Sequence, residues 1–527
     1  MLHLNYLKAS LKVIYQLMSE VNYHESTKVL KQKEWNELRE RLKSDLSEKV
    51  IEYLFEPSIL AERERSFSNM MNVNQAHLSM LLAEGIVEEE TGKKIKKGLD
   101  EIAGEGKRAL YIDPKLEDLY FNIEKRLIEK VGTEAGGQLH TGRSRNDLYT
   151  TVLRMNTRDS LLIIMELVLQ TRHVILQVAK ENTSTVISGY THMQPAEPIT
   201  LGHYFSALGQ AFERDSHRLV NAFQMTNCSP LGSGAMAGTT FPINRETTAK
   251  QLGFCGVLDN SLDGIASRDY LLESLSAMNI LMNHTNRIAQ DLYIWSTDEF
   301  GTVAVGDSVA ASSSIMPQKK NPITFEHMKA KSSHVLGAYV SATGCLSNIS
   351  YGHCRDLSES ATYLWEAFKE VEASLNLFNE TVQTLSFNEA LMLERAVLNF
   401  TTVTELANVI VREEKISFRQ AHHIVGNVVN YMLEHRIPLT ELSSELIEEI
   451  AYNVLGQKIA LRTDKIESAL NPILNVKSKN SKGGPAPEEV KKQIGKLEIK
   501  LKKDERFYDQ LKAAIMRSKA ELDEALV

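Results

Sequence analysis

The sequence predicts an all-α protein built around a central bundle of long helices, with smaller helical domains before and after it. Apolar residues recur at helical spacing over three long stretches, 150–182, 270–298 and 325–384. Proline, which breaks helices, is missing from 115–194 and from 323–437. Strand signals are scarce, and the polar interruptions between the helices are short. Sites in such a bundle form where loops and helix ends converge.

Length and composition limit what the chain can be. A chain of 527 residues is too long for one small core, and we expect four segments: a helical N-terminal extension (1–56), an N-terminal helical domain (57–141), a central helical-bundle domain (142–395) and a C-terminal helical domain (396–527). The net charge of -8 is spread without long runs of like charge. This gives no electrostatic reason to expect nucleic acid or an anionic membrane as a partner.

The cysteines and the apolar segments suggest a compartment. The four cysteines, at 228, 255, 345 and 354, form no C-x-x-C pair and no metal-ligand spacing. We interpret them as reduced thiols of a cytoplasmic protein without a metal. The start of the chain lacks a basic segment followed by a clean apolar one, and the most apolar run, Leu161 to Leu169, is interrupted by Glu166 and is too short to span a bilayer.

The first 141 residues predict helices and little chemistry. Trp35 and Leu42 belong to the apolar positions that predict amphipathic helices in the extension. A later helix carries His77 and ends near Gly85, since glycine favours the backbone geometry that closes a helix. We interpret His77 as a packed or surface histidine and not as a ligand.

The first polar loop is rich in hydrogen-bond donors. It reads Gly136-Gly-Gln-Leu-His-Thr-Gly-Arg-Ser-Arg-Asn-Asp147. Arg143, Arg145 and Asn146 suit a carboxylate, because the arginine fork binds both of its oxygens. A capped helix start is the alternative interpretation, since Ser144, Asn146 and Asp147 are also capping residues.

Two further loops interrupt the helices. Gly189-Tyr-Thr-His-Met-Gln-Pro-Ala-Glu-Pro198 sets Thr191 beside His192, ahead of prolines that fix the chain direction. A lone histidine there would be structural. The Gly/Ser-rich run 231–246 offers backbone N–H groups for an anion, but it lacks the order of a P-loop and predicts no nucleotide.

The fourth loop has the strongest chemical character. Ala311-Ser-Ser-Ser-Ile-Met-Pro-Gln-Lys-Lys-Asn-Pro322 places three serines near Lys319 and Lys320, between prolines that exclude a helix. Backbone N–H groups and an ammonium stabilise an alkoxide, so a serine there can act as a base or nucleophile. A solvated turn with surface lysines is the plain alternative.

The C-terminal part continues helical. The neighbouring histidines His422 and His423 cannot both face one metal on a helix, so we interpret them as structural. The run 477–487 is rich in lysine, serine, glycine and proline and predicts a flexible loop. A charged helix follows it.

Taken together, the four loops resemble the fumarase/aspartase superfamily, most closely its argininosuccinate lyase branch. The matching runs are His140-Thr-Gly-Arg-Ser-Arg-Asn-Asp147, Gly189-Tyr-Thr-His-Met-Gln194, Leu231-Gly-Ser-Gly-Ala-Met-Ala-Gly238 and Ser313-Ser-Ile-Met-Pro-Gln-Lys-Lys-Asn-Pro322, in the order and at separations similar to those of that branch. The resemblance covers roughly 57–500 and leaves the N-terminal extension without an assignment.

The resemblance implies an activity and its residues. Members of this family eliminate an amine or hydroxide from a succinyl group and release fumarate without a cofactor or metal. It implies that Ser313 is the base, that His192 assists the departing nitrogen, and that Lys319 acts at the carboxylate that takes up charge. The remaining matches are expected to bind substrate: Ser144, Arg145, Asn146, Thr191, Gln194 and Asn321. It also implies a cytoplasmic homotetramer with an all-helical core, in which each active site is shared between subunits.

The departures from the branch concern the amine half of the substrate. Argininosuccinate lyases usually hold that half with a tyrosine, a glutamine and a lysine in one segment. Here a gapless alignment places His353, Ser358 and Ala361 at those positions, and His353 becomes the candidate binding residue. Further differences are Met70, Asn74, Leu148 and Ser312.

We therefore expect a carbon–nitrogen lyase that reversibly eliminates fumarate from an N-substituted aspartate, whose amine half is not arginine but, for example, an aminopolycarboxylate such as ethylenediaminedisuccinate. Argininosuccinate lyase proper is the first alternative, and adenylosuccinate lyase fits the loops less well. An alternative of another class is a non-catalytic structural protein on the same fold, as in lens crystallins.

Overall fold

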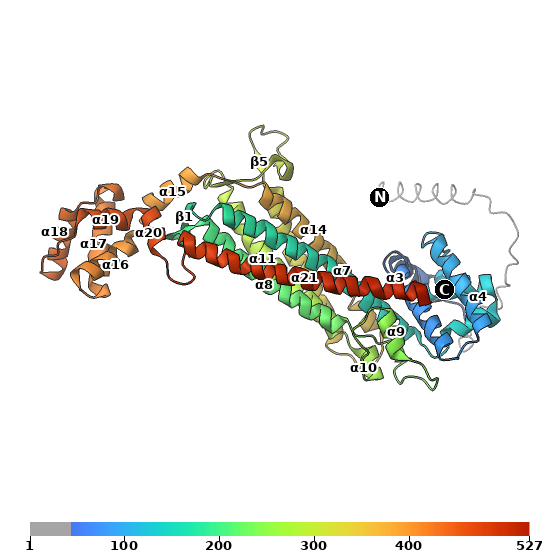
Figure 1. The fold of residues 1–527 in the computed structure, drawn as a ribbon. Helices are drawn as coiled ribbons and strands as arrows, with labels where there is room; N and C mark the ends of the chain where they lie inside the picture. Colours follow the sequence, from blue (N-terminus) through green and yellow to red (C-terminus); the bar gives the residue numbers. More distant parts are fainter. Residues whose placement is uncertain (1–43, 526–527) are drawn as a thin grey trace.

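The structure is a computed structural model that describes residues 44–525. Most of the expected N-terminal extension, including Trp35 and Leu42, lies outside the described residues. Residues 48–56 run without a break into the first long helix, through α2 (Glu48–Val50) and the π-helix η2 (Ile51–Phe55). Figure 1 shows a long bundle with a smaller group of helices at each end.

The N-terminal group packs around its own apolar core. Its helices after η2 are α3 (Glu56–Ala83), α4 (Glu89–Glu105), η3 (Pro114–Leu116), α5 (Leu119–Val131), α6 (Thr133–Gly136) and η4 (Gly137–His140). The α3 helix ends where Gly85 follows with a φ of +66°. His77 is 1% exposed, which confirms that it is packed.

The central bundle consists of long helices joined by the polar loops. Its elements are α7 (Arg145–Glu181), β1 (Val186–Thr191), β2 (Gln194–Thr200), α8 (Leu201–Thr226), α9 (Arg245–Gln251), α10 (Ser261–Ala266), α11 (Asp269–Trp295), β3 (Val303–Ala304), η5 (Asp307–Val309), β4 (Ala311–Ser312), β5 (Lys320–Asn321), α12 (Ile323–Leu346), α13 (Arg355–Glu359) and α14 (Leu364–Gln383). The expectation of one helical stretch over 325–384 is wrong at its centre. The helix breaks after Leu346, where the run Ser347-Asn-Ile-Ser-Tyr-Gly352 has low helix propensity.

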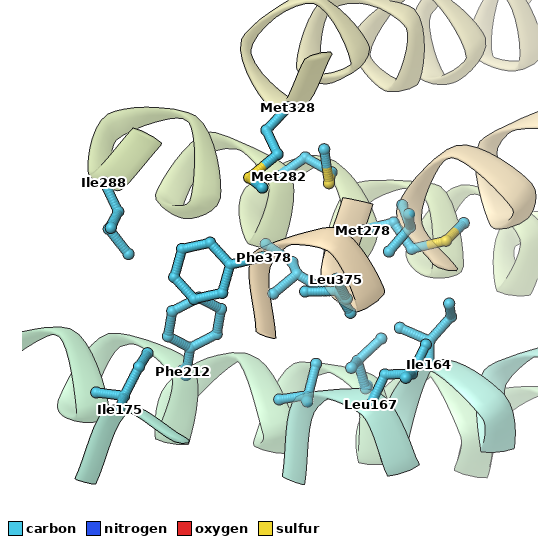
Figure 2. Packing of buried hydrophobic residues seen from close by; sticks show 14 of the residues in the cluster. Ile164, Leu167, Ile175, Phe212, Met278, Met282, Ile288, Met328, Leu375 and Phe378 are labelled. Carbon is cyan, nitrogen blue, oxygen red and sulfur yellow. The ribbon is translucent and has the colours of Figure 1, made fainter. Parts of the chain in front are cut away.

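The core of the bundle is formed by α7, α8, α11, α12 and α14, together with one face of α21 (Pro487–Ala525). Figure 2 shows Ile164 of α7, Phe212 of α8, Met282 of α11, Met328 of α12 and Phe378 of α14 converging on one apolar interior. The rings of Phe212 and Phe378 pack with their centroids 5.9 Å apart. Such mutual burial of apolar faces is the main stabilising contribution in a helical bundle.

Helix α7 is long and apolar enough to cross a membrane by length and composition alone. However, 61% of its most apolar stretch is buried inside the protein. Its apolar face contacts the neighbouring helices of the bundle. This pattern is that of the core helix of a globular domain.

The C-terminal elements form a separate small core and then return to the bundle. They are β6 (Ser386–Phe387), α15 (Glu389–Leu398), α16 (Val403–Glu414), α17 (Phe418–His435), η6 (Leu439–Glu441), α18 (Ser444–Leu455), α19 (Thr463–Leu470), α20 (Pro472–Ser478) and α21 (Pro487–Ala525). The expected loop is therefore shorter than 477–487. Although the predicted C-terminal domain includes α21, this helix packs along α7, where Asp504 accepts a 2.6 Å bond from the buried Arg172.

The strands form three two-stranded antiparallel sheets: β1 with β2, β3 with β6, and β4 with β5. All three are short and lie at the ends of helices. The hairpin of β1 and β2 carries the second polar loop, and the pair of β4 and β5 closes the fourth. Residues 44–525 thus form an all-α fold, in which two of the three strand pairs, β1 with β2 and β4 with β5, lie where candidate functional loops leave the bundle.

Candidate active site

The predicted site residues fall into three groups on one chain. The Arg145 group consists of Ser144, Arg145, Asn146 and His353, near the start of α7. The hairpin group consists of Thr191, His192 and Gln194, on the turn between β1 and β2. The Ser313 group consists of Ser313, Lys319 and Asn321, on the loop joined by β4 and β5.

The start of α7 is a capped helix as well as a candidate binding loop. The Ser144 hydroxyl accepts a hydrogen bond from the Asn146 N–H, and the Asp147 carboxylate accepts one from the Ser144 N–H. This reciprocal pair is a capping box, which satisfies two donors that the first turn leaves unpaired. The capped-helix interpretation is therefore confirmed, and the binding role of the loop stays a prediction; the Ser144 hydroxyl oxygen accepts a bond within the helix start.

Asp147 also holds the third loop against the first. Its Oδ2 accepts hydrogen bonds from the Gly232 and Gly234 N–H groups at 3.0 and 2.8 Å. The Asn146 amide donates to the Ala235 carbonyl at 3.2 Å. The Asp147 side chain is 0% exposed, and burial raises its pKa to about 6 against the opposing effect of these backbone donors. The two loops therefore form one unit.

Arg145 is positioned by an acidic partner and a ring. Its Nη1 donates to Asp118 at 2.6 Å, and its guanidinium lies 4.3 Å from the centroid of the Phe121 ring. Asp118 also caps α5 by accepting from the Phe121 N–H. Burial raises the pKa of Asp118, and Arg145 opposes this rise. The fork of Arg145 is thus fixed in direction before any ligand binds.

A second carboxyl, Glu62 of α3, lies close to Asp118. Its Oε2 is buried without a hydrogen-bond partner among residues 44–525. Burial first, and then the charge of Asp118, raise the pKa of Glu62 to about 7, while Arg65, a hydrogen bond with the Tyr149 side chain and Arg355 act in the opposite direction. A buried carboxyl in this state is costly unless a cation or donor reaches it.

His353 lies in a basic environment. Burial, Arg268 and Arg145 lower its pKa, so the two arginines lie near its ring. Arg268 is 5% exposed and donates to the Thr150 hydroxyl on α7. The Tyr351 hydroxyl donates to Asp263, which ties the segment of His353 to α10. Cationic groups therefore surround His353, as an anionic ligand requires.

A network of buried hydrogen bonds supports the first loop. The His140 Nδ1 lies 2.9 Å from the Tyr120 hydroxyl, which donates to Glu124 at 2.8 Å. Burial and the charge of Arg143 lower the pKa of His140 to about 4, so its ring is neutral at pH 7. His140 thus supports the loop. The Arg143 guanidinium lies 5.1 Å from the centroid of the Tyr120 ring, and its buried nitrogens have no hydrogen-bond partner among residues 44–525.

The hairpin group sits on a strained turn. Thr191 pairs with Gln194, which leaves a two-residue turn of His192 and Met193. Both have positive φ, 53° and 61°, the geometry of a type I′ turn that normally uses asparagine or glycine. Strain of this kind at non-glycine residues is concentrated at functional sites. Both side chains are exposed at the tip.

The Ser313 loop projects from the bundle. The Ser313 hydroxyl accepts from the Met316 N–H at 3.0 Å, and Lys320 ties the loop base to Asp307 and the Val305 carbonyl, each at 2.6 Å. Lys319 is exposed. Ile315 at the loop tip is 83% exposed, an unusual cost for a large apolar side chain in a free loop.

The chain keeps the Arg145 group apart from the other two groups. Helix α7 has 37 residues and spans about 55 Å between the Arg145 group and the strand that leads to the hairpin. Helix α12, with 24 residues and a length of about 36 Å, separates the Ser313 group from His353. In Figure 1, α9 and α10 lie at one end of the bundle and β1 at the other, with β5 on the side of β1.

Two other features of residues 44–525 offer no alternative centre. A cavity of about 420 Å³ between α3, α7 and α21 contains none of the predicted site residues. No group of three or more His, Cys, Asp or Glu side chains in this range is placed to hold a metal ion. The absence of a cofactor and metal remains a prediction.

Sequence reasoning missed three groups near Arg145: Glu62, Asp118 and Arg268. Glu62 lies 83 positions before Arg145 on a helix with no visible motif. Asp118 carried a weak signal, since it precedes an apolar helix as a capping residue. Arg268 carried none, because only the packing of α10 beside α7 brings it to the site.

Comparisons with known proteins agree on one family. A model of the lyase family matches residues 40–337, and one described as argininosuccinate lyase C-terminal matches residues 400–478. Argininosuccinate lyase 1 of Shouchella clausii is 48% identical over 90% of this chain and 96% of its own. Argininosuccinate lyase of Methanocaldococcus jannaschii is 39% identical over the same shares. A crystal structure of EDDS lyase in complex with formate is 30% identical, with a TM-score of 0.83 over 92% of this chain and 96% of that one.

We predict that Asp147→Asn destabilises the protein by an amount on the order of 2 kcal/mol. The amide NH2 must face either the Ser144 N–H or the N–H groups of Gly232 and Gly234, which leaves buried donors unpaired. Urea unfolding measures the change. Asp100→Asn on the surface of α4 is the control and is expected to change stability by about 0.5 kcal/mol or less. Equal effects of the two substitutions would contradict the role of Asp147.

Proposed function

The chain belongs to the argininosuccinate lyase branch of the fumarase/aspartase superfamily, and we propose that its substrate is an N-substituted aspartate with a cationic amine half. Argininosuccinate is the first candidate. Members of this branch are fumarate-releasing carbon–nitrogen lyases. The carbon–nitrogen lyase activity follows from the family. The proposal of a cationic amine half is supported by one observation above all, the pair of buried carboxyls Glu62 and Asp118 beside Arg145.

The charges of the Arg145 group suit both halves of such a substrate. Arg145 and Arg268 favour the carboxylates of the succinyl half, because guanidinium groups bind carboxylates with directed bonds. A guanidinium or ammonium on the amine half would offset the cost of the Glu62 carboxylate, whose Oε2 is buried without a partner. An anionic amine half would add to the repulsion that already exists between Glu62 and Asp118.

We propose a base-initiated elimination. Ser313 takes a proton from the carbon beside the carboxylate, and the charge moves into an aci-carboxylate that Lys319 and Asn321 stabilise. The C–N bond then breaks, its electrons remain with the nitrogen, and the carbon electrons form the double bond of fumarate. His192 delivers a proton to the departing amine, while Thr191, Gln194, Ser144 and Asn146 bind the succinyl group.

This chemistry requires more than one chain. The lengths of α7 and α12 separate the Arg145 group from the hairpin group and from the Ser313 group, so we propose a homotetramer in which different subunits supply the groups of one site. Exposed apolar residues on the central helix α12, Leu336 at 48% and Val340 at 60%, support a helix-on-helix interface. A subunit alone is expected to be inactive.

An aminopolycarboxylate such as ethylenediaminedisuccinate is the second candidate substrate. It is favoured by Ala361, which is 7% exposed and stands where the branch carries its lysine for the amine half. The likeness to EDDS lyase also supports it. The test is fumarate release, followed by ultraviolet absorbance, from argininosuccinate and ethylenediaminedisuccinate in parallel. Turnover of the first supports the proposal, and turnover of the second alone contradicts the cationic half.

We predict that Ser313→Ala lowers turnover by a factor on the order of 10³, because the proton acceptor is removed. Fumarate release from the substrate found above is measured, with the assembled mass determined by light scattering. Ser314→Ala is the matched control and is expected to keep most activity, since it removes a neighbouring hydroxyl on the same loop. Near-normal turnover of Ser313→Ala with an intact assembly would remove the assignment.

We predict that His192→Asn lowers turnover by roughly 100-fold while leaving the fold intact. Asparagine tolerates the positive φ at this position, so the turn is kept and only the proton donor is lost. Met193→Asn is the control, since it makes the same change at the other turn position. If both variants lose activity equally, the effect lies in the turn and not in the imidazole.

We predict that the KM for a cationic substrate falls as pH rises from about 6 to about 8, because Glu62 ionises with a pKa of about 7. In Glu62→Gln this dependence is lost and KM is raised. The free energy of unfolding changes in the opposite direction. Because folding raises the pKa of Glu62, the contribution of Glu62 to stability is present below its ordinary pKa and is lost as pH rises through about 7. Glu64→Gln, an exposed neighbour on α3, is the control, and an unchanged profile in Glu62→Gln would contradict the role.

A further inference from the structure

We propose that Cys228 and Cys255 are a redox modification site, at which a peroxide forms a reversible disulfide that shifts the glycine-rich loop of the candidate active site. Their Sγ atoms lie 3.7 Å apart. Both are free thiols, Cys255 exposed and Cys228 partly exposed. Nothing in the proposed elimination uses either of them.

The pairing is fixed by the backbone. Ser229 and Val257 form an isolated parallel bridge, and the Ser229 N–H donates to the Gly256 carbonyl at 2.8 Å. The Cys255 N–H donates to the Asn227 carbonyl at 3.0 Å. The segments that carry the two cysteines are therefore held side by side.

The two thiols differ in reactivity. Burial first, and then the neighbouring Cys255, raise the pKa of Cys228 to about 11. Cys255 is the more exposed of the two, and its Sγ donates to the Asn227 carbonyl at 2.9 Å. Peroxide therefore reaches Cys255 first, and Cys228 is the resolving thiol.

The reaction balances with hydrogen peroxide as the oxidant. The Cys255 thiolate attacks the O–O bond, which breaks to give a sulfenic acid and, with a proton, one water. The Cys228 sulfur then attacks the Cys255 sulfur, the S–O bond breaks, and hydroxide leaves with the thiol proton as a second water. Two thiols and one peroxide thus give one disulfide and two waters.

The disulfide acts on a loop that the site needs. A bond length near 2.05 Å requires the sulfurs to approach by roughly 1.6 Å. Cys228 directly precedes the strand-like Ser229 and the glycine-rich loop, whose Gly232 and Gly234 N–H groups bind Asp147. The Ala235 carbonyl of the same loop accepts from Asn146. Movement at Cys228 therefore displaces Asn146, and a misplacement of about 1 Å at a binding residue is costly for turnover.

The experiment uses the full chain, reduced and then treated with hydrogen peroxide. We expect two of the four thiols to be lost per chain, a peptide map that joins Cys228 to Cys255, and a fall in fumarate release of about tenfold or more that dithiothreitol reverses. Faster hydrogen exchange of the loop amides at 229–238 is the second readout. The activity readout rests on the proposed function, whereas the thiol count, the map and the exchange do not.

Two variants complete the test. Cys255→Ser is expected to keep basal activity and to resist peroxide, and Cys345→Ser, which removes a thiol of α12, is expected to respond like the natural chain. Retention of four thiols, or a map that joins other cysteines, would overturn the site. A mapped disulfide with unchanged exchange at 229–238 would overturn its effect on the loop.

Discussion

The rigid length of α7 is the constraint on which the site depends. The helix runs 37 residues without a proline, begins at a capping box, and packs against α8, α14, α21 and α3. Its two ends carry the Arg145 group and the chain that enters the hairpin. Because a helix of this kind does not fold back on itself, one chain presents the two groups about 55 Å apart. Assembly of several chains is the physical route by which they meet.

Electrostatics at the start of α7 combine opposite requirements in a small volume. Arg145, Arg268 and the helix N-terminus favour carboxylates, whereas Glu62 and Asp118 favour a cation. Each buried charge is costly alone, Arg145 and Asp118 offset each other as an ion pair, and under the proposed function a ligand that carries both signs would meet the remaining requirements. An adduct of aspartate and a basic amine is such a ligand. For the identity of the amine half, the charges near Arg145 are therefore stronger evidence than the presence of Ala361 at the position where the branch usually has a lysine.

The two other groups lie on parts of the chain that the bundle leaves exposed. The turn of His192 and Met193 keeps positive φ at two side chains that would prefer other geometry, and the Ser313 loop exposes Ile315. Neither feature stabilises the isolated chain. In the proposed homotetramer, a neighbouring subunit would cover these loops and bring a binding group to them. The third loop is different, since Asp147 fixes it within its own chain, and the nearby pair of Cys228 and Cys255 can therefore act on the site locally.

The sequence by itself determined the helical class, the chemical loops and the family. Stretches with helical spacing predicted α7, α11 and the region that forms α12 and α14, because periodicity is a local property. The dense loop motifs identified Ser313, His192 and Arg145 as candidates. Only the tertiary structure decided which residues lie together. Glu62, Asp118 and Arg268 come to the region of Arg145 from separate parts of the chain. Cys228 lies beside Cys255 because two loop segments pair through their backbones, and the spacing of the cysteines in the sequence does not reveal this pairing. The separation of the three groups was also invisible, because sequence order records distance along the chain, whereas chemistry depends on distance in space.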